Sequence, residues 1–133
     1  MAELPTVSDY MARSLTTFKP DDSIHSAVRT LLENRFSGAP VIDENGELVG
    51  LISKKDCLAV VYSGSFHKEW SGVVKDYMNT DIEFIDADTD IIAAADRFVQ
   101  SRFRRFPVMS GGKLVGLLSR HDILKALNDQ WDD

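Results

Sequence analysis

The chain has 133 residues and a formal net charge of −6, from 15 basic and 21 acidic residues. Its apolar share of 44% and charged share of 27% are those of an average globular protein, which excludes disordered and fibrous classes. The acidic balance disfavours nucleic-acid binding, because a phosphate backbone repels net negative charge. The sequence has no apolar run near the roughly 18 residues of a membrane span and no signal-peptide pattern at its start. We therefore expect a cytoplasmic protein without membrane insertion.

The sequence contains one unit twice. Val7 recurs as Val74, a shift of 74 − 7 = 67 positions, and Gly50 recurs as Gly116, a shift of 116 − 50 = 66. Two copies of about 65 residues, each marginal alone, predict one body made of two pseudo-symmetric halves. We expect the first repeat at 1–62, a linker at 63–72, the second repeat at 73–128 and an acidic tail at 129–133. Further matched positions are Asp9/Asp76, Tyr10/Tyr77, Met11/Met78, Pro40/Pro107, Ser53/Ser119 and Asp56/Asp122.

Each repeat begins with a short amphipathic segment, at 7–11 and 73–78, and continues into a strand-like stretch, at 15–18 and 82–85. A helix follows, because apolar residues recur at i, i+3, i+4, i+7 and i+8. These apolar positions are Ile24, Ala27, Val28, Leu31 and Leu32 in the first repeat, and Ile91, Ala94, Ala95, Phe98 and Val99 in the second. The N-cap candidates are Asp22 or Ser23, and Thr89 or Asp90.

Two short strands and a second helix complete each repeat, so the predicted order is β-α-β-β-α and the fold class is α+β. The pair Gly111-Gly112 resembles a phosphate-binding loop, but a glycine pair between two apolar strands is far more often a hairpin turn, which we prefer. The predicted strands are 39–42 with 48–52 and 106–109 with 114–118, joined by turns at 44–47 and 110–113, and the closing helices are 54–62 and 120–127.

The junction before each closing helix carries the pattern Gly-apolar-apolar-Ser-x-x-Asp, at 50–56 and 116–122. In structural terms this is a capping box, with serine as N-cap and the carboxylate three residues later. In functional terms a helix N-terminus with a hydroxyl and a carboxylate suits a polar ligand, since aspartate accepts both hydroxyls of a ribose and glycine permits close approach to the backbone. The two interpretations are compatible.

This junction, the proline at the start of the preceding strand (Pro40 and Pro107) and the double occurrence resemble a tandem of cystathionine beta-synthase (CBS) domains, or Bateman module. The resemblance covers about 7–127. It implies two repeats packed through their sheets that bind AMP, ADP, ATP or S-adenosylmethionine in clefts between them, and that regulate an associated, here unidentified, protein.

The resemblance also implies the residues of each cleft, with aspartate and serine from one repeat and the first strand and the segment before the proline from the other. Apolar side chains would hold the adenine, and Asp56 or Asp122 the ribose. The first cleft would combine Ser53, Lys55 and Asp56 with Ile82, Glu83, Phe103, Arg104, Arg105 and Phe106. The second would combine Ser119, Arg120, His121 and Asp122 with Leu15, Thr16, Phe36, Ser37, Gly38 and Ala39.

The two clefts differ in charge, because Arg104 and Arg105 occupy the positions of Ser37 and Gly38 in the other repeat. Guanidinium groups suit phosphate oxygens, so we expect the first cleft to bind nucleotide more tightly. A solvated sheet edge is the structural alternative for these arginines.

The remaining candidates are better explained by structure. Cys57 corresponds to Ile123, which predicts core packing, and neither His25 nor His67 has partners at a metal-binding spacing. The lone cysteine also excludes an internal disulfide framework. The run 57–62 is more apolar than one covered face requires, which together with the resemblance predicts a homodimer.

Two functions fit the sequence, and a third is disfavoured. The first is a regulatory module that senses an adenine nucleotide, or alternatively S-adenosylmethionine, and modulates a partner protein. The second is a ligand-free module for dimerisation or protein interaction. An enzyme finds little support, because no nucleophile-and-base pair or metal cluster recurs at usable spacing, so no catalytic residue or catalytic cofactor is expected.

Overall fold

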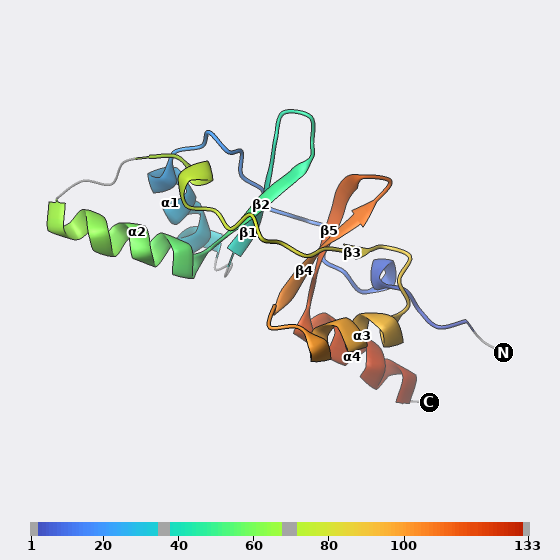
Figure 1. Ribbon diagram of the computed structural model, residues 1–133. Coiled ribbons are helices and arrows are strands. Elements are labelled where there is room, and N and C mark those ends of the chain that lie inside the picture. Colours follow the sequence, from blue (N-terminus) through green and yellow to red (C-terminus); the bar gives the residue numbers. More distant parts are fainter. Residues whose placement is uncertain (1–2, 35–37, 68–71, 132–133) are drawn as a thin grey trace. The chain divides into compact units, whose positions relative to one another are not determined.

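The computed structural model describes residues 3–34, 38–67 and 72–131, with the side chains of 63–67 left undescribed (Figure 1). The chain forms two compact units. Unit 1 contains Met1–Leu15 and Glu83–Asp133, and unit 2 contains Thr16–Ile82. Each unit combines a small sheet with helices, so the predicted α+β class with two repeats is confirmed.

Unit 2 is built around an antiparallel hairpin. Its strands pair along their length, with Gly38 opposite Ser53, and two single bridges extend the hairpin on either side: Phe18 lies parallel to Val41, and Asn79 antiparallel to Leu51. Its elements are α1 (Ile24–Asn34), β1 (Gly38–Ile42), β2 (Leu48–Ser53), α2 (Lys54–His67) and the 3-10 helix η2 (Val74–Asp76).

Unit 1 repeats this plan. Its sheet has the order β3-β4-β5, with β3 parallel to β4 and β4 antiparallel to β5, and Ala12 bridges Leu117 at the other edge. All of these pairings except Asp86 with Met109 and Ser110 with Lys113 correspond to one in unit 2 at the shifts of 67 and 66 found in the sequence. Its elements are the 3-10 helix η1 (Val7–Asp9), β3 (Ile85–Asp86), α3 (Ile91–Gln100), β4 (Arg105–Ser110), β5 (Lys113–Ser119) and α4 (Arg120–Trp131).

The two repeats exchange their first segments. The Val7 N–H donates to the Thr89 carbonyl at 2.8 Å, and the Ile91 N–H at the start of α3 donates to Pro5 at 3.1 Å. In unit 2, Val74 donates to Asp22 in the same way, also at 2.8 Å. Each compact unit is therefore the body of one repeat completed by the opening segment of the other, and the units cut across the sequence repeats.

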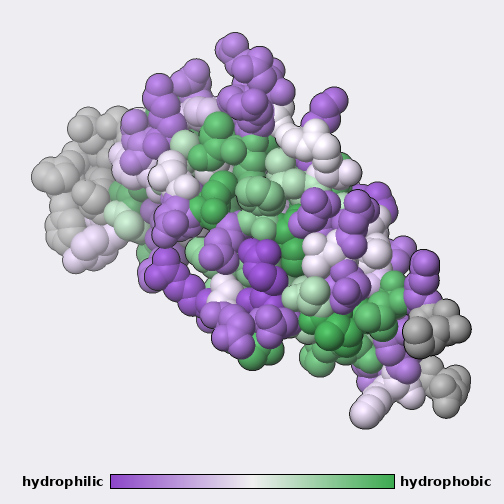
Figure 2. Space-filling view, turned by 45° about the vertical axis from the view of Figure 1, so that its right-hand side comes forward, coloured by the Kyte–Doolittle hydropathy of each residue, from purple (hydrophilic) through white to green (hydrophobic). Residues whose placement is uncertain are grey.

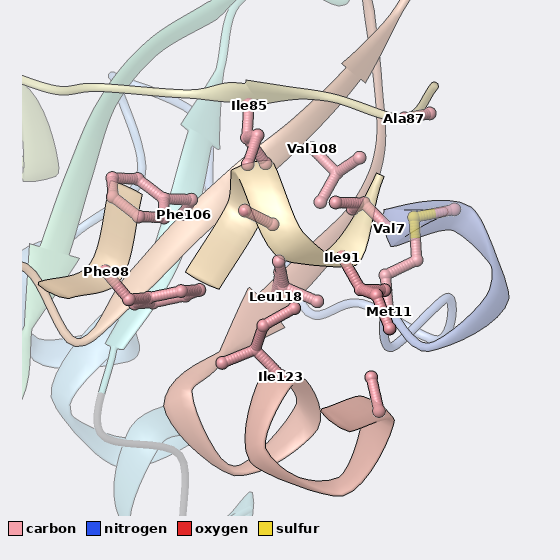
Figure 3. Close-up of a cluster of buried hydrophobic side chains, with 12 residues drawn as sticks. Val7, Met11, Ile85, Ala87, Ile91, Phe98, Phe106, Val108, Leu118 and Ile123 are labelled. Carbon is pink, nitrogen blue, oxygen red and sulfur yellow. The ribbon is translucent and has the colours of Figure 1, made fainter. Parts of the chain in front are cut away.

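Each unit has its own hydrophobic core. In unit 1, side chains from η1, β3, α3, β4, β5 and α4 meet in the cluster drawn in Figure 3, in which Val7, Ile91 and Phe106 are fully buried. In unit 2, Val74 occupies the place of Val7, beside Ile24. Because Val7 and Val74 belong to the exchanged segments, neither core is complete without a residue of the other repeat.

Several local predictions are confirmed. The helix N-caps are Ser23, whose Oγ accepts from the Ser26 N–H at 3.1 Å, and Asp90, whose carboxylate accepts from the Ala93 N–H at 2.8 Å. Gly111 and Gly112 form the turn between β4 and β5, with φ of 58° and 79° that favour glycine. The glycine pair is thus a hairpin turn.

Other local predictions were wrong about the width of an apolar stripe or the length of an element. Leu32 and Val99, expected on the apolar stripes of α1 and α3, are 65% and 80% exposed, because only three or four positions of each helix reach the core. The strand-like stretches pair only at Phe18 and from Ile85 onward. The closing helices are longer than expected, since α2 continues to His67 and α4 to Trp131. Residues 68–71 of the predicted linker lie outside the described residues.

Candidate functional site

The two strand-to-helix junctions have the same hydrogen-bonded geometry. At the start of α2, the Ser53 N–H and the Ser53 hydroxyl both donate to Asp56 Oδ2 at 2.9 Å, and the Asp56 N–H donates to Ser53 Oγ at 3.1 Å. At the start of α4, the Ser119 N–H donates to Asp122 Oδ2 at 2.9 Å and the Asp122 N–H to Ser119 Oγ at 3.2 Å. Both junctions are therefore capping boxes.

The capping bonds use only one oxygen of each carboxylate. Within the described ranges, Asp56 and Asp122 accept through Oδ2, and no donor bonds to Oδ1. Both side chains are half-buried. The cap thus fixes the orientation of a carboxylate that uses one of its two oxygens for the capping bonds.

The glycine of each motif serves a different purpose from the predicted one. A Cβ at Gly50 would lie 2.6 Å from Met78 Sδ, and a Cβ at Gly116 would overlap Met11 Sδ and lie 2.9 Å from the Ala12 carbonyl oxygen. The space above each glycine is filled by the methionine of the exchanged segment. The interpretation that these glycines admit a ligand to the backbone was wrong, whereas the prediction that Met11 and Met78 are core residues is confirmed for Met11, which is 8% exposed.

Arginine side chains adjoin the junction of unit 1. Arg105 is paired with Ser119 across β4 and β5, and the Arg120 N–H donates to the Arg104 carbonyl at 3.2 Å. In unit 2 the corresponding partner of Ser53 is Gly38, where a Cβ would lie 2.9 Å from the Ile52 carbonyl oxygen. Both junctions have basic residues at the helix start, Lys54 and Lys55 in unit 2 and Arg120 in unit 1, but only in unit 1 does the strand residue opposite the serine carry a cationic side chain.

The other predicted cleft residues of unit 1 vary in accessibility. Phe103 is half-buried, with its ring centroid 6.3 Å from that of Phe106, whereas Phe106 has no exposed surface, so only its backbone could meet a ligand. Glu83 is exposed and pairs with Arg97 at 3.7 Å. Leu15 is half-buried, and His121 is exposed.

In unit 2, Thr16 and Ile82 are half-buried, Lys55 is exposed and Ala39 is 3% exposed. Phe36 and Ser37 lie outside the described residues. Because each predicted cleft draws residues from both units, the grouping of these residues stays a prediction.

Cys57 and the metal-ligating residue types offer no reactive group among the described residues. Cys57 is 5% exposed in the core of unit 2, as predicted, and burial followed by the nearby Asp56 charge raises the pKa of its thiol, which disfavours the reactive thiolate. Among the described residues, no three His, Cys, Asp or Glu side chains form a group that could hold a metal ion. Over those same residues, every helix is too short or too polar to cross a bilayer.

One polar cluster was missed by the sequence analysis. The Tyr10 hydroxyl and Lys125 Nζ both donate to Asp129 Oδ2, at 2.9 and 3.0 Å. These bonds raise the pKa of Tyr10 and of Lys125 and lower the pKa of Asp129. Asp129, expected in the acidic tail, thus helps to hold the exchanged segment on α4, and the i,i+4 spacing from Lys125 was the available signal.

Comparison with known proteins agrees with this geometry. The family model described as CBS domain matches residues 7–63 and 74–129. The uncharacterized protein MJ1225 of Methanocaldococcus jannaschii is 29% identical over 94% of this chain, and the chloroplastic CBS domain-containing protein CBSX1 of Arabidopsis thaliana is 32% identical over 91%. The chain spans 44% and 63% of the length of these two relatives, less than two thirds of either.

A solved structure is similar throughout. The CBS-pair protein CBSX2 of Arabidopsis thaliana, in its complex with AMP, matches with a TM-score of 0.82 and 33% identity, covering 96% of this chain and 98% of that one. Two family matches that together span most of the sequence agree with the internal repeat and with the duplicated Ser-x-x-Asp junctions. The chain therefore belongs to the CBS-domain family, as a tandem pair of CBS domains.

Proposed function

We propose that this chain is a regulatory module that binds an adenine nucleotide, AMP, ADP or ATP, at its Ser-x-x-Asp junctions and thereby modulates a partner protein. The observation that carries the proposal is the duplicated capping box, in which Asp56 and Asp122 are fixed through Oδ2 and present Oδ1. The AMP complex of CBSX2, at 33% identity, supports it.

The chemistry of the junction suits a ribose. Two adjacent hydroxyl groups need an acceptor held in one place, and a carboxylate locked by its own helix cap meets that need without losing rotamer freedom on binding. Hydrogen bonds to a charged acceptor contribute about 1.5–3 kcal/mol each. The helix N-terminus adds a favourable potential for an anionic ligand.

Regulation follows from differential affinity. A ligand shifts a protein between two arrangements only as far as it binds one of them better. The proposed role is therefore non-catalytic: the nucleotide selects one arrangement, and the partner protein responds to it.

A homodimer is part of this proposal. Leu58 on α2 and its counterpart Leu124 on α4 are 67% and 68% exposed, and Tyr62 is 64% exposed. Figure 2 shows apolar side chains reaching the surface among polar ones on the face in view. Apolar side chains repeated at equivalent exposed positions favour burial against a second copy of the chain.

For this dimer we expect the double variant Leu58→Lys and Leu124→Lys to be monomeric in sedimentation analysis at concentrations where the parent chain is a dimer. The control Leu32→Lys changes an equally exposed leucine on α1 and should leave the mass unchanged. A monomeric parent chain would contradict the dimer while leaving nucleotide binding untouched.

The ligand is identified by a thermal-shift screen of the unaltered chain with AMP, ADP, ATP, adenosine and S-adenosylmethionine. A ligand at a hundred times its Kd stabilises the folded state by about 2.7 kcal/mol, which shifts the melting temperature by several degrees. We expect such a shift with at least one adenine nucleotide. No shift at millimolar concentration would favour the ligand-free interaction module, and a shift with S-adenosylmethionine alone would favour the alternative sensor.

The variants Asp56→Asn and Asp122→Asn separate the cap from the ligand. An amide oxygen still accepts the capping bonds, so we expect the free protein to lose less than about 1 kcal/mol of stability. The second acceptor oxygen and the charge are lost, so each variant should bind nucleotide at its own junction about 10- to 100-fold more weakly. The matched controls are Asp9→Asn and Asp76→Asn, because these carboxylates also cap short helices, accepting from the Thr6 and Val73 N–H groups.

A further inference from the structure

The chain crosses between the two units twice, once in each direction. Among the described residues, strand pairing with unit 1 ends at the bridge of Ala12, and pairing with unit 2 begins at Phe18. On the way back, pairing with unit 2 ends at the bridge of Asn79, and pairing with unit 1 begins at Ile85 in β3. We call the residues between these limits the first connection, 13–17, and the second connection, 80–84.

An arginine holds the second connection at its unit 1 end. Nη2 of Arg97, on α3, donates to the Phe84 carbonyl at 3.1 Å and lies 3.7 Å from Glu83 Oε2. The same guanidinium packs on the fully buried Phe106 ring, with Cζ 4.9 Å from the ring centroid. A planar guanidinium can stack on a ring and donate in its own plane at the same time. Arg97 therefore fastens the end of the second connection to the core of unit 1.

An arginine also holds the first connection at its unit 1 end. Nη2 of Arg13 donates to the Ser8 carbonyl at 2.8 Å and to Ser8 Oγ at 3.0 Å. Ser8 is itself fixed in unit 1, because its N–H donates to the Ala87 carbonyl at 3.1 Å. The side chain of the first residue of this connection thus folds back onto η1. Both connections are fastened to the same unit.

The sequence repeat does not preserve these two arginines. At the shift of 67, Arg13 corresponds to Thr80 and Arg97 to Thr30. A threonine side chain has neither the length nor the several donors of a guanidinium. The positions that would fasten the connections to unit 2 therefore lack an equivalent anchor, although the two connections are themselves related by the repeat.

Any change in the arrangement of the two units requires both connections to bend, because the chain links the units only there. A hinge consists of a few residues that absorb the change in backbone dihedral angles. The arginines remove Arg13 from one connection, and Glu83 and Phe84 from the other. What is left is 14–17 and 80–82, where the Asp81 N–H makes a local bond to Asn79 Oδ1 at 2.9 Å.

We propose that Arg13 and Arg97 are anchors that confine the hinge between the two units to residues 14–17 and 80–82. Both anchors act on unit 1, so Arg13 and Phe84 move with unit 1 and the bending takes place next to Phe18 and Asn79 of unit 2. This inference goes beyond the proposed function, because it locates the conformational step through which a bound nucleotide would act on a partner protein.

The anchors are tested by ¹⁵N relaxation of the full chain without ligand. In the parent chain, the amides of Arg13 and Phe84 should have order parameters of about 0.85, as in rigid backbone. In Arg97→Gln the value at Phe84 should fall below about 0.6 while that at Arg13 stays unchanged, and Arg13→Gln should give the reverse. The control Arg29→Gln removes an exposed arginine of α1 and should change neither. The melting temperature of each variant checks that it folds.

The hinge is tested by residual dipolar couplings of the same amides, which also report slower reorientation. In the parent chain, the couplings of Arg13 and Phe84 should fit the orientation of unit 1, and those of 14–17 and 80–82 should fit neither unit. In the double variant Arg13→Gln and Arg97→Gln, the amides of residues 13 and 84 should lose their fit to unit 1.

Either of two results would overturn the inference. One is a parent chain in which 14–17 and 80–82 share a single orientation with both units, since no hinge would then lie there. The other is unchanged order parameters at residues 13 and 84 in the glutamine variants, since the arginines would then anchor nothing. Neither measurement uses a ligand, so a failure of nucleotide binding would contradict the proposed function and leave the hinge in place.

Discussion

The Phe106→Ala variant is expected to lose about 3–5 kcal/mol of its free energy of unfolding, measured by chemical denaturation. The Phe106 side chain has no exposed surface, and its ring packs against Phe98 at 4.7 Å and beneath the Arg97 guanidinium at 4.9 Å. Removing the ring leaves a cavity in the core of unit 1 and ends both contacts, each of which adds to the cost of the lost burial.

The matched control for this variant is Val99→Ala on α3. Val99 is 80% exposed, so its truncation should change stability by no more than about 0.5 kcal/mol. A loss below about 1 kcal/mol for Phe106→Ala would contradict the described core of unit 1.

The Gly116→Ala variant should destabilise unit 1 by about 1–3 kcal/mol, more than Gly50→Ala destabilises unit 2. At Gly116 the new Cβ would lie 2.9 Å from the Ala12 carbonyl oxygen, which accepts from the Leu117 N–H and cannot move without breaking that bridge. At Gly50 the backbone oxygen of Asn79 is 3.2 Å away, and the closest atoms belong to the flexible Met78 side chain.

This difference tests the exchange of opening segments. Hydrogen exchange of the Ala12 and Leu117 amides should accelerate in Gly116→Ala, because each amide donates to the other residue's carbonyl. Adding Met78→Ala to Gly50→Ala should restore stability toward that of Met78→Ala alone. Equal costs at the two glycines, or unchanged exchange at Ala12, would show that the exchanged segment is not held against β5.

The elements that the sequence predicted well are those set by local interactions. The hairpin turn at Gly111 and Gly112 follows from backbone conformations that glycine favours, and the N-caps Ser23 and Asp90 follow from side chains that bond their own helix. The repeat itself is visible as matched residues, and the fold class follows from it.

What the sequence could not predict depends on distant contacts. Periodicity placed Leu32 and Val99 on the covered stripes, but the width of a stripe is decided by what packs against the helix. The exchange of the opening segments leaves no signal in the local sequence, since Val7 would be predicted as a core residue whichever repeat it packed against. The glycines of the motif looked like ligand contacts because their true neighbours, Met11 and Met78, are remote in the sequence.

The candidate site was predictable in part. Spacing alone identified the Ser-x-x-Asp junctions as caps, and the structure adds that each cap uses one carboxylate oxygen. The sequence also predicted the difference in charge between Arg104-Arg105 and Ser37-Gly38. It could not predict which junction the arginines adjoin within a unit, because that depends on the strand register, which sets Arg105 opposite Ser119.

The central claim is that the two carboxylates hold an adenine nucleotide, and titration calorimetry of the double variant Asp56→Asn and Asp122→Asn tests it most directly. The parent chain and the control Asp9→Asn with Asp76→Asn should bind the nucleotide found in the thermal-shift screen. The double variant should bind it at least about tenfold more weakly, while its melting temperature without ligand stays close to that of the controls. Equal affinity in the double variant and the parent chain would contradict the claim and leave the junctions as helix caps alone.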